Sequence, residues 1–271
     1  MTKIRKAAVA GYFYPSNPEK LSDEIETLIS ISNPGINLKN ITGIVSPHAG
    51  YIYSGRTAAY AYNLLSGKDI HKIIIISPSH REYFPGVCIY EGDGYETPLG
   101  VVEVDSELAG KLIDGNRIIY RGVEGHKDEH AIEVQIPFLQ KMINKFKIIP
   151  IVMGDQGKMF VDKLAVKISE AADDKTLIVA SSDLSHYYSK NQADELDSVI
   201  EEDINKFDSE KLQNDLKLKK CEACGGGPIV AMMKAAFLMN KKNAKVLNRS
   251  NSGDTTGDYS GVVGYLSAAV Y

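Results

Sequence analysis

The sequence predicts an α/β protein with a central mixed, mostly parallel sheet and helices on both faces of the sheet. Two observations support this expectation. First, apolar runs rich in Ile and Val recur at 44–45, 73–76, 148–152 and 177–180, and such runs are typical of strands buried on both faces. Second, segments with apolar residues at helical spacing lie between these runs, which indicates βαβ units. No linker, low-complexity stretch or repeat interrupts the chain, so we expect a single domain over residues 1–271.

Composition and charge narrow the class of protein further. The chain is 44% hydrophobic and 24% charged, which is ordinary for a globular protein with a core on both sides of a sheet. It has 31 Lys and Arg against 35 Asp and Glu, a net charge of -4, and its basic residues are scattered. We therefore do not expect nucleic acid as a partner.

Membrane insertion and export are not expected either. No stretch reaches the roughly 20 apolar residues that cross a bilayer. The basic amino terminus is followed by an apolar run that Gly11 and Pro15 cut too short for a signal peptide. Three cysteines do not suggest a disulfide framework and fit a reducing compartment. We expect a cytoplasmic protein.

The first part of the chain reads as helix, strand, helix and strand. Asn17 is expected to cap a helix that begins at Pro18 and ends before the turn at residues 33–35. The first apolar run forms a strand, and a second helix is expected over residues 54–65, stopped by Gly67. The next strand is the run of four isoleucines.

The middle of the chain departs from this alternation. Two β-branched runs at 87–90 and 101–104, separated by Gly and Pro, predict a hairpin-like excursion. Ser106 should then cap a short helix. A helical stripe follows over 131–142, which Pro137 should kink or restart.

The last part returns to alternating strands and helices. Pro150, inside the third apolar run, indicates an edge strand or a local irregularity. The helix expected over 229–239 is apolar nearly all round and should be buried. The other expected elements are helices at 158–172, 192–207 and 209–218, and strands at 246–250 and 261–270.

Three of the predicted strands end shortly before a histidine, namely His48, His80 and His186. In open sheets of parallel strands, ligands bind outside the carboxyl ends of the strands. We therefore expect these three side chains to meet in one crevice. His71 and His126 lie elsewhere and fit a structural or surface role, which is common for histidine.

Cys224 precedes three glycines, Pro228 and the buried helix. Proline is favoured at the start of a helix, glycine permits close approach of the backbone, and a helix amino terminus would favour the thiolate. A thiolate with neutral imidazoles suits iron, copper or zinc better than magnesium or calcium. The alternative is that Cys224 is a small buried apolar residue. Cys221 completes a CxxC pair, but no second pair accompanies it, so we expect neither a redox disulfide nor a zinc knuckle.

Other residues could transfer protons. Asp183 precedes His186 by three positions, and His130 lies between Glu129 and Glu133. A histidine near a helix start tends to stay neutral because the helix dipole opposes its charging. His130 could therefore act as a base or as a hydrogen-bond donor to a ligand. For Glu129, capping at the surface is the favoured interpretation.

Six motifs run in the order seen in the Memo family, and the resemblance, to a prokaryotic member, spans essentially the whole chain. They are PHAGYIYSG, SPSH, EHAIEVQIPFLQ, SSDLSHY, CGGGPI and the terminal Gly-Asp-Tyr-Ser-Gly. The fold of that family is similar to that of class III, LigB-type extradiol dioxygenases, the non-haem iron enzymes that open catechol rings. The resemblance thus implies a LigB-like α/β fold.

The resemblance also implies roles for single residues. His48, His80 and Cys224 occupy the positions that bind metal in the family, and His130, Asp183 and His186 line the same pocket. The chain differs from animal relatives after the cysteine, where it has two glycines in place of Arg-His. It also lacks the carboxylate that usually completes the ligand set of a dioxygenase, so ring cleavage does not follow from the resemblance.

Three functions are compatible with these residues. The first is a metal-dependent redox protein, an oxidoreductase of an unknown small substrate, with iron or copper and with His130 or His186 moving protons. The second is a zinc hydrolase with Asp183 or Glu133 as base. The third is a non-catalytic protein that binds a peptide or an anionic ligand, as the family's link to phosphopeptide partners in animals suggests. A homo-oligomer is compatible with each.

Overall fold

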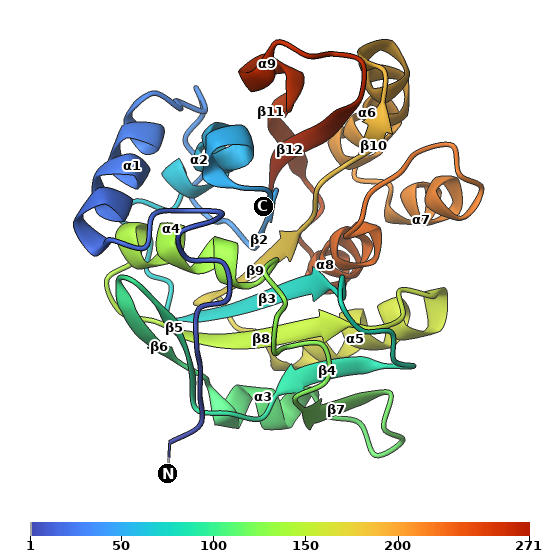
Figure 1. Ribbon diagram of the computed structural model, residues 1–271. Helices are drawn as coiled ribbons and strands as arrows, with labels where there is room; N and C mark the ends of the chain where they lie inside the picture. Colours follow the sequence, from blue (N-terminus) through green and yellow to red (C-terminus); the bar gives the residue numbers. More distant parts are fainter. Residues whose placement is uncertain (1) are drawn as a thin grey trace.

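Strands and helices alternate along most of the chain in the computed structural model, which describes residues 2–271 (Figure 1). The strands are β1 (Ile4–Arg5), β2 (Gly43–Ser46), β3 (Lys72–Pro78), β4 (Val87–Tyr90), β5 (Gly94–Thr97), β6 (Gly100–Glu103), β7 (Ile119–Gly122), β8 (Lys147–Met153), β9 (Thr176–Ser181), β10 (His186–Tyr188), β11 (Ala244–Asn251) and β12 (Val262–Val270). The helices are α1 (Pro18–Ser30), α2 (Arg56–Asn63), α3 (Ser106–Leu112), α4 (Ile136–Met142), α5 (Lys158–Ala171), α6 (Lys190–Asn205), α7 (Ser209–Lys217), α8 (Gly226–Leu238) and α9 (Gly253–Thr256).

The main sheet has nine strands and is mixed, as predicted. Its order is β10-β12-β2-β9-β3-β8-β4-β7, and β11 pairs with β12 outside this path. The four central strands, β2, β9, β3 and β8, are parallel to one another. Antiparallel pairing begins on either side of them, where β12 meets β2 and β4 meets β8. The parallel part therefore forms the middle of the sheet.

Alternate residues of the central strands face two separate cores, so helices cover both faces (Figure 1). In β3, Ile73 and Ile75 pack with the helices α1, α2 and α4. Ile74 and Ile76 point the other way, toward α3, α5 and α8. Because side chains of a strand alternate between faces, a strand that is apolar at every position must be covered on both.

The predicted hairpin is present, but one of its two strands differs from the prediction. The run at 87–90 is β4, which joins the main sheet between β8 and β7. The hairpin forms instead between β5 and β6, in a separate three-stranded sheet with β1. All four residues of β4 are buried, whereas three of the four residues of β6 are exposed. A fully buried strand needs a covered position in a sheet, which explains the difference.

Prolines and caps mark several element boundaries. Pro150 does not lie in an edge strand, since β8 has β3 on one side and β4 on the other, but the ladder with β4 stops at Ile151, one residue short of it. Asn17 caps α1 as predicted, accepting the N–H of Lys20 at 2.9 Å. The cap of α3 is Asp105, not Ser106. Residues 133–135 form a 3-10 turn, and the helix with Pro137 in its first turn starts after it.

The carboxyl ends of the four central parallel strands all lie at one edge of the sheet. β2 ends at Ser46, β3 at Pro78, β8 at Met153 and β9 at Ser181. The segments that follow these residues carry most of the side chains discussed below. Within residues 2–271, no helix has both the length and the apolar character needed to cross a membrane.

Candidate metal centre

His48 lies just beyond β2 and is almost fully buried. Its Nδ1 is 2.8 Å from the hydroxyl of Ser181, at the end of β9. That hydroxyl donates its hydrogen to the carbonyl of Ala131 at 2.7 Å and accepts a hydrogen from the amide of Gln135 at 2.8 Å. Because the hydroxyl has one hydrogen and a carbonyl can only accept, His48 must donate from Nδ1. Its Nε2 therefore presents a lone pair on the other side of the ring.

His80 lies beyond β3 and is held by Glu129. The carboxylate accepts the backbone N–H of His80 at 2.7 Å and the ring Nδ1 of His80 at 2.9 Å. Burial alone would raise the pKa of Glu129, but its hydrogen bonds and charge interaction with His80 outweigh this and lower the pKa to about 2. An ionised carboxylate can only accept, so Nδ1 of His80 is the donor and Nε2 is free.

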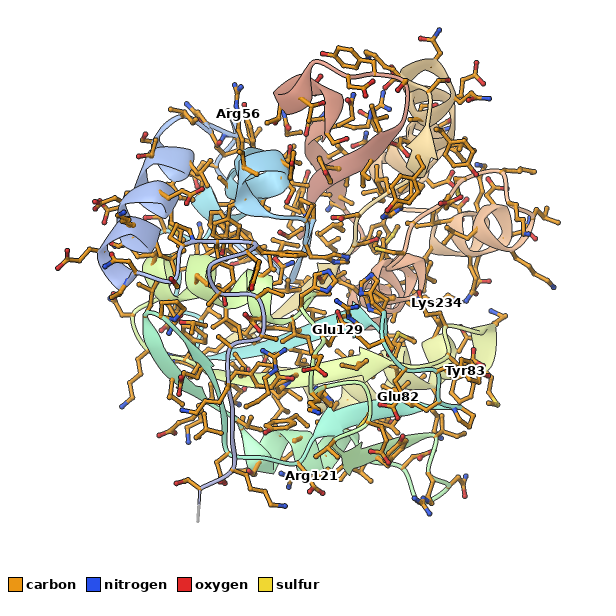
Figure 2. The ribbon with its side chains drawn as sticks, in the orientation of Figure 1. Arg56, Glu82, Tyr83, Arg121, Glu129 and Lys234 are labelled. Carbon is orange, nitrogen blue, oxygen red and sulfur yellow. The ribbon has the colours of Figure 1, made fainter. Side chains whose placement is uncertain are left out.

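The Glu129–His80 pair corrects the interpretation of Glu129 as a surface cap. Its side chain is fully buried near the middle of the molecule (Figure 2). A buried carboxylate that orients a histidine is the usual partner of a metal-binding imidazole, because it fixes the tautomer and the direction of the ring.

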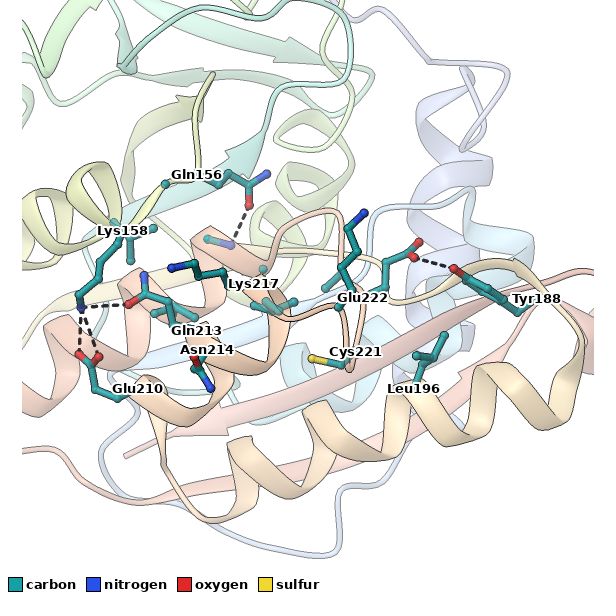
Figure 3. A pocket seen from close by; sticks show the side chains of 18 residues that line it. Gln156, Lys158, Tyr188, Leu196, Glu210, Gln213, Asn214, Lys217, Cys221 and Glu222 are labelled. Atoms are coloured by element: carbon teal, nitrogen blue, oxygen red, sulfur yellow. Dashed lines mark hydrogen bonds and ion pairs between the residues drawn. The ribbon is translucent and has the colours of Figure 1, made fainter.

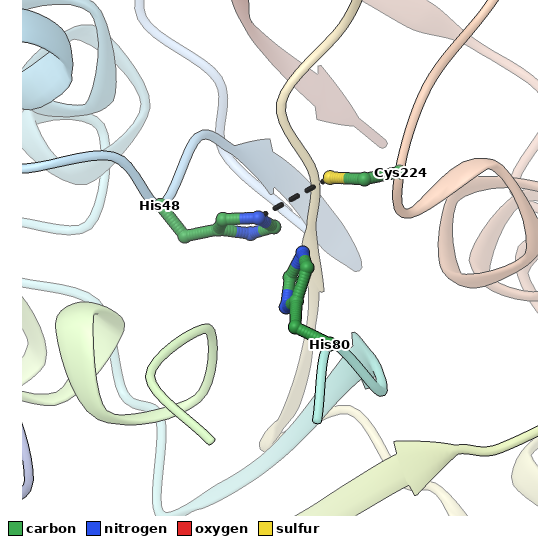
Figure 4. Close-up of side chains that lie close together, drawn as sticks. All are labelled: His48, His80 and Cys224. Carbon is green, nitrogen blue, oxygen red and sulfur yellow. Dashed lines mark hydrogen bonds between the residues drawn. The ribbon is translucent and has the colours of Figure 1, made fainter. Parts of the chain in front are cut away.

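Cys224 lies before α8 and points at His48, with Sγ 3.2 Å from Nε2 (Figure 4). The loop after β9 holds the cysteine: the N–H of Cys224 donates to the carbonyl of Asp183 at 3.2 Å, and the N–H of Asp183 donates to Sγ at 3.3 Å. Burial and then the Asp183 carboxyl raise the pKa of the Cys224 thiol. The expected lowering by the helix amino terminus is therefore outweighed, and the metal-free protein carries a neutral thiol.

The structure brings together the three residues that the family resemblance implied as metal ligands. One ligand atom from each of His48, His80 and Cys224 lies within 4.8 Å of the other two. His48 is almost fully buried and Cys224 is partly buried, whereas 28% of the His80 side chain is exposed. The cluster is therefore reached from solvent on the His80 side.

The ring of His130 packs against the two histidines of this cluster, whereas the ring of His186 does not. Its ring centroid lies 5.4 Å from that of His48 and 4.7 Å from that of His80. Burial and then the nearby His48 lower the pKa of His130 to about 4, so it is neutral at pH 7. Its Nδ1 is buried without a hydrogen-bond partner among the described residues. His80, Glu129 and His130 form a second group whose ligand atoms lie within 4.8 Å of one another.

Asp183 borders the cluster and His186 lies further out. The carboxyl of Asp183 accepts the N–H of His48 at 2.7 Å through Oδ1, and Oδ2 is 4.0 Å from Nε2 of His48. Burial raises the pKa of Asp183. His186 lies in β10 beside β12, with its ring against Tyr187 at 5.8 Å, and within residues 2–271 it joins neither group of potential ligands.

Glu133, expected as an alternative base, has a structural role. Its carboxylate is fully buried, pairs with Arg5, and accepts the hydroxyl of Tyr14 and the N–H groups of Ala8 and Val9. Each oxygen of the carboxylate accepts two of these hydrogen bonds, so Glu133 is not placed to act as a base. The sequence pattern does not predict the roles of Ser181, Gln135 and Arg5, because only the folded chain shows what a buried polar residue contacts.

The remaining histidines and cysteines stay outside the cluster. His126 is buried between the hydroxyl of Tyr95 and the carbonyl of Cys88, which is a structural role as predicted. His71 pairs with Asp69 at the surface. All three cysteines are free, and Cys221 is buried in the core, so no disulfide forms between Cys221 and Cys224.

Fold and site together define an α/β protein with two histidines and a cysteine gathered at the carboxyl edge of its parallel strands. The chain belongs to the Memo family. The family model described as "Memo-like protein" matches residues 5–269. A MEMO1 family protein of Thermoplasma volcanium is 40% identical over 267 residues, covering 97% of each chain. One from Methanocaldococcus jannaschii is 38% identical over 288 residues, covering 100% of each chain.

A solved structure shows the same fold at much lower sequence identity. The crystal structure of an uncharacterized protein from Escherichia coli K12 matches with a TM-score of 0.56 and 12% identity. The match covers 85% of this chain and 100% of that chain. At this identity the likeness concerns the fold alone.

Proposed function

We propose that the protein is a metal-dependent redox protein in which His48, His80 and Cys224 hold an iron or copper ion. One observation carries the proposal: a ligand atom from each residue lies within 4.8 Å of the other two. Ligand atoms lie roughly 2.0–2.3 Å from the ion they bind, so two ligand atoms of one ion can be at most about twice that distance apart. The three side chains would need little movement to bind.

The chemistry of the donors supports the proposal. Both imidazoles are hydrogen-bonded through Nδ1, which leaves Nε2 as the nitrogen that can bind the metal. Burial and then the neighbouring His80 lower the pKa of His48 to about 3, so protons do not compete for its ring at neutral pH. Two neutral imidazoles and a sulfur form a borderline-to-soft set, suited to iron, copper or zinc. Bound iron or copper would supply one-electron redox chemistry.

Other residues would then act on a small substrate that enters beside His80. His130 is neutral, and its Nδ1, 3.4 Å from the Glu129 carboxylate, has no hydrogen-bond partner within residues 2–271, so it could bond to the substrate. Asp183 lies against both His48 and Cys224. With its raised pKa it is the best placed residue to hold or release a proton at this edge of the cluster.

One observation favours a second candidate, a zinc hydrolase. Zinc with two histidines, a cysteine and a water is a known catalytic arrangement. The Oδ2 atom of Asp183, 4.0 Å from Nε2 of His48, could accept a proton from that water. The identity of the bound metal separates the two functions.

The experiment is metal analysis of protein purified without oxygen and without added metal. We expect near-unit iron or copper in the wild type, and loss of metal in His48→Ala, His80→Ala and Cys224→Ser. His71→Ala and Cys221→Ala are the controls, since neither residue belongs to the cluster, and both should retain metal. Stoichiometric zinc would select the hydrolase. A wild type without metal, or single variants that retain it, would contradict both functions.

A further inference from the structure

The Cys224 loop is clamped from a second direction by Gln156, which follows β8. The side-chain amide of Gln156 donates to the carbonyl of Cys224 at 2.8 Å. Its carbonyl oxygen accepts the N–H of Gly227, in the first turn of α8, at 2.7 Å. One side chain thus connects the end of a central strand to the residue carrying the candidate thiolate and to the helix that follows.

The two bonds determine the orientation of the amide. The carbonyl of Cys224 can only accept and the N–H of Gly227 can only donate, so the nitrogen of Gln156 must face the cysteine. The fit is close, because a Cβ atom on Gly227 would lie 2.7 Å from Cβ and 2.8 Å from Oε1 of Gln156. Gly227 and Gln156 are therefore complementary in shape as well as in hydrogen bonding.

Gln156 also lines a pocket of about 860 Å³ on the outer side of the same loop, beside α7 and α8 (Figure 3). The residue is only partly buried. Cys224 does not line this pocket, whereas Cys221, Glu222 and Ala223 do. The Cys224 loop thus has the histidines on one side and this pocket on the other, with Gln156 at the boundary.

We infer that Gln156 is a positioning residue for Cys224: by clamping the loop between β8 and α8, it holds Sγ at the distance from His48 that metal binding requires. The Ser182–Asp183 loop anchors the cysteine on the histidine side, and Gln156 is the matching anchor on the pocket side. The effect of Gln156 on metal binding rests on the proposed function, whereas its effect on the position of the Cys224 thiol does not.

Two variants separate positioning from general stability. Gln156→Met keeps the length of the side chain and loses both bonds. Gln156→Glu keeps the bond from Gly227, but places a carboxylate oxygen against the carbonyl of Cys224, so it should fold well and disturb the cysteine alone. Gln213 provides the control, because it lines the same pocket and accepts hydrogen bonds from Lys158 and Lys234 rather than bonding to the Cys224 loop. Gln213→Met and Gln213→Glu should leave Cys224 unaffected.

The first measurement needs no metal. Metal-free proteins are treated with iodoacetamide, and alkylation of Cys224 is followed by peptide mass spectrometry, with Cys221 as internal reference. Loss of two hydrogen bonds should speed alkylation of Cys224 about tenfold in Gln156→Met. Because a nearby carboxylate disfavours the thiolate, Gln156→Glu is compared with the wild type at the alkaline plateau of the rate, where it should also react faster. The Gln213 variants should match the wild type. Wild-type rates in both Gln156 variants would overturn the inference.

The second measurement uses Co²⁺ as a spectroscopic probe. Wild-type protein should show a thiolate-to-cobalt charge-transfer band that Cys224→Ser abolishes. Both Gln156 variants should bind Co²⁺ about 10- to 100-fold more weakly, as for other residues that orient a metal ligand, with a weakened band at saturation. An unchanged band in both would count against positioning. If the wild type shows no such band, the proposed metal site fails, and the alkylation rates still decide the role of Gln156.

Discussion

At the scale of single residues, the candidate site is a set of groups whose proton positions are determined by their neighbours. Ser181 makes His48 donate from Nδ1, and Glu129 does the same for His80. Both rings therefore offer Nε2 to the same region. Because imidazole tautomers interconvert freely in water, this preference has to come from buried partners, and each partner should influence metal affinity.

Replacing Glu129 by Gln should weaken metal binding about 10- to 100-fold, because the neutral amide binds the His80 N–H groups less strongly and no longer favours one tautomer. A competition titration against a chromogenic chelator measures the change. Glu82→Gln is the control, since its carboxylate accepts the N–H of Gly125 and belongs to neither group of potential ligands. Equal affinity in wild type and Glu129→Gln would show that the carboxylate does not orient His80.

Metal affinity should rise with pH. The pKa of the Cys224 thiol is raised, whereas those of His48 and His130 are about 3 and about 4. Between roughly pH 5 and pH 8 the thiol must lose a proton on binding, and this proton alone should increase affinity about tenfold per pH unit. Calorimetry in buffers of different ionisation enthalpy should show that the thiol proton is released when the ion binds. Cys224→Ser should show a smaller pH dependence, and a pH dependence equal to that of the wild type would contradict a role for the thiolate.

At the scale of elements, the site depends on loops that leave parallel strands at one edge of the sheet. The loops after β2, β3 and β9 carry His48, His80 and Asp183, and the loop after β8 carries Gln156. The cysteine comes from elsewhere, the segment between α7 and α8, and must pass close to the end of β9. That close approach is where a glycine is required.

Gly225→Ala should test that approach. A Cβ atom there would lie 2.2 Å from the carbonyl oxygen of Ser181 and 2.7 Å from Cβ of Ser182. The backbone would have to move, which should lower the free energy of unfolding by about 1–3 kcal/mol and reduce metal affinity. Urea unfolding measures the first effect.

The matched control for Gly225→Ala is Gly110→Ala, inside α3. A Cβ atom at Gly110 meets nothing within 4 Å, and alanine is the better helix former, so this variant should be stabilised by roughly 0.5–1 kcal/mol. If Gly225→Ala were as stable as the wild type and bound metal equally well, the close approach of the Cys224 loop to β9 would not constrain the site.

At the scale of the whole molecule, the amino-terminal segment is tied to the site through buried charge. Arg5 pairs with Glu133, and its guanidinium also donates to the carbonyls of His126 and Glu129. The segment then continues to Phe13, whose ring packs against His130 at 4.9 Å. Residues far apart in the sequence thus support the segment that holds Glu129 in place.

Glu133→Ala should destabilise the protein by about 3–5 kcal/mol, because it leaves Arg5 as a buried charge without its partner. Urea unfolding gives the free energy, and hydrogen exchange should show faster exchange at Ala8 and Val9, whose N–H groups lose their acceptor. Glu91→Ala, which removes the exposed partner of Lys3, should cost less than about 1 kcal/mol. A similar small cost for Glu133→Ala would show that the buried pair does not anchor the segment.

Much of the fold follows from local sequence pattern. The four Ile and Val runs are the central parallel strands, since a run of apolar residues can only be a strand covered on both faces or a buried helix, and these runs are too short for helices. Where the sequence pattern predicted the wrong strand pairing, the reason lies in the tertiary structure. The runs at 87–90 and 101–104 do not pair with each other, because β4 pairs with β8 in the covered main sheet. Pro150 is compatible with an interior strand because the ladder between β4 and β8 ends at Ile151.

The sequence by itself predicted the mixed α/β fold and placed His48 and His80 at one edge of the sheet, because residues beyond parallel strands emerge there. The resemblance to the Memo family implied Cys224 as the third ligand. Only the tertiary structure decided that His130 rather than His186 completes the histidine group, and that Glu129, Ser181 and Gln156 orient it. Spacing along the chain limits where a side chain can be. The partner of a buried polar group depends on which distant segments pack against it, and that is settled only when the chain folds.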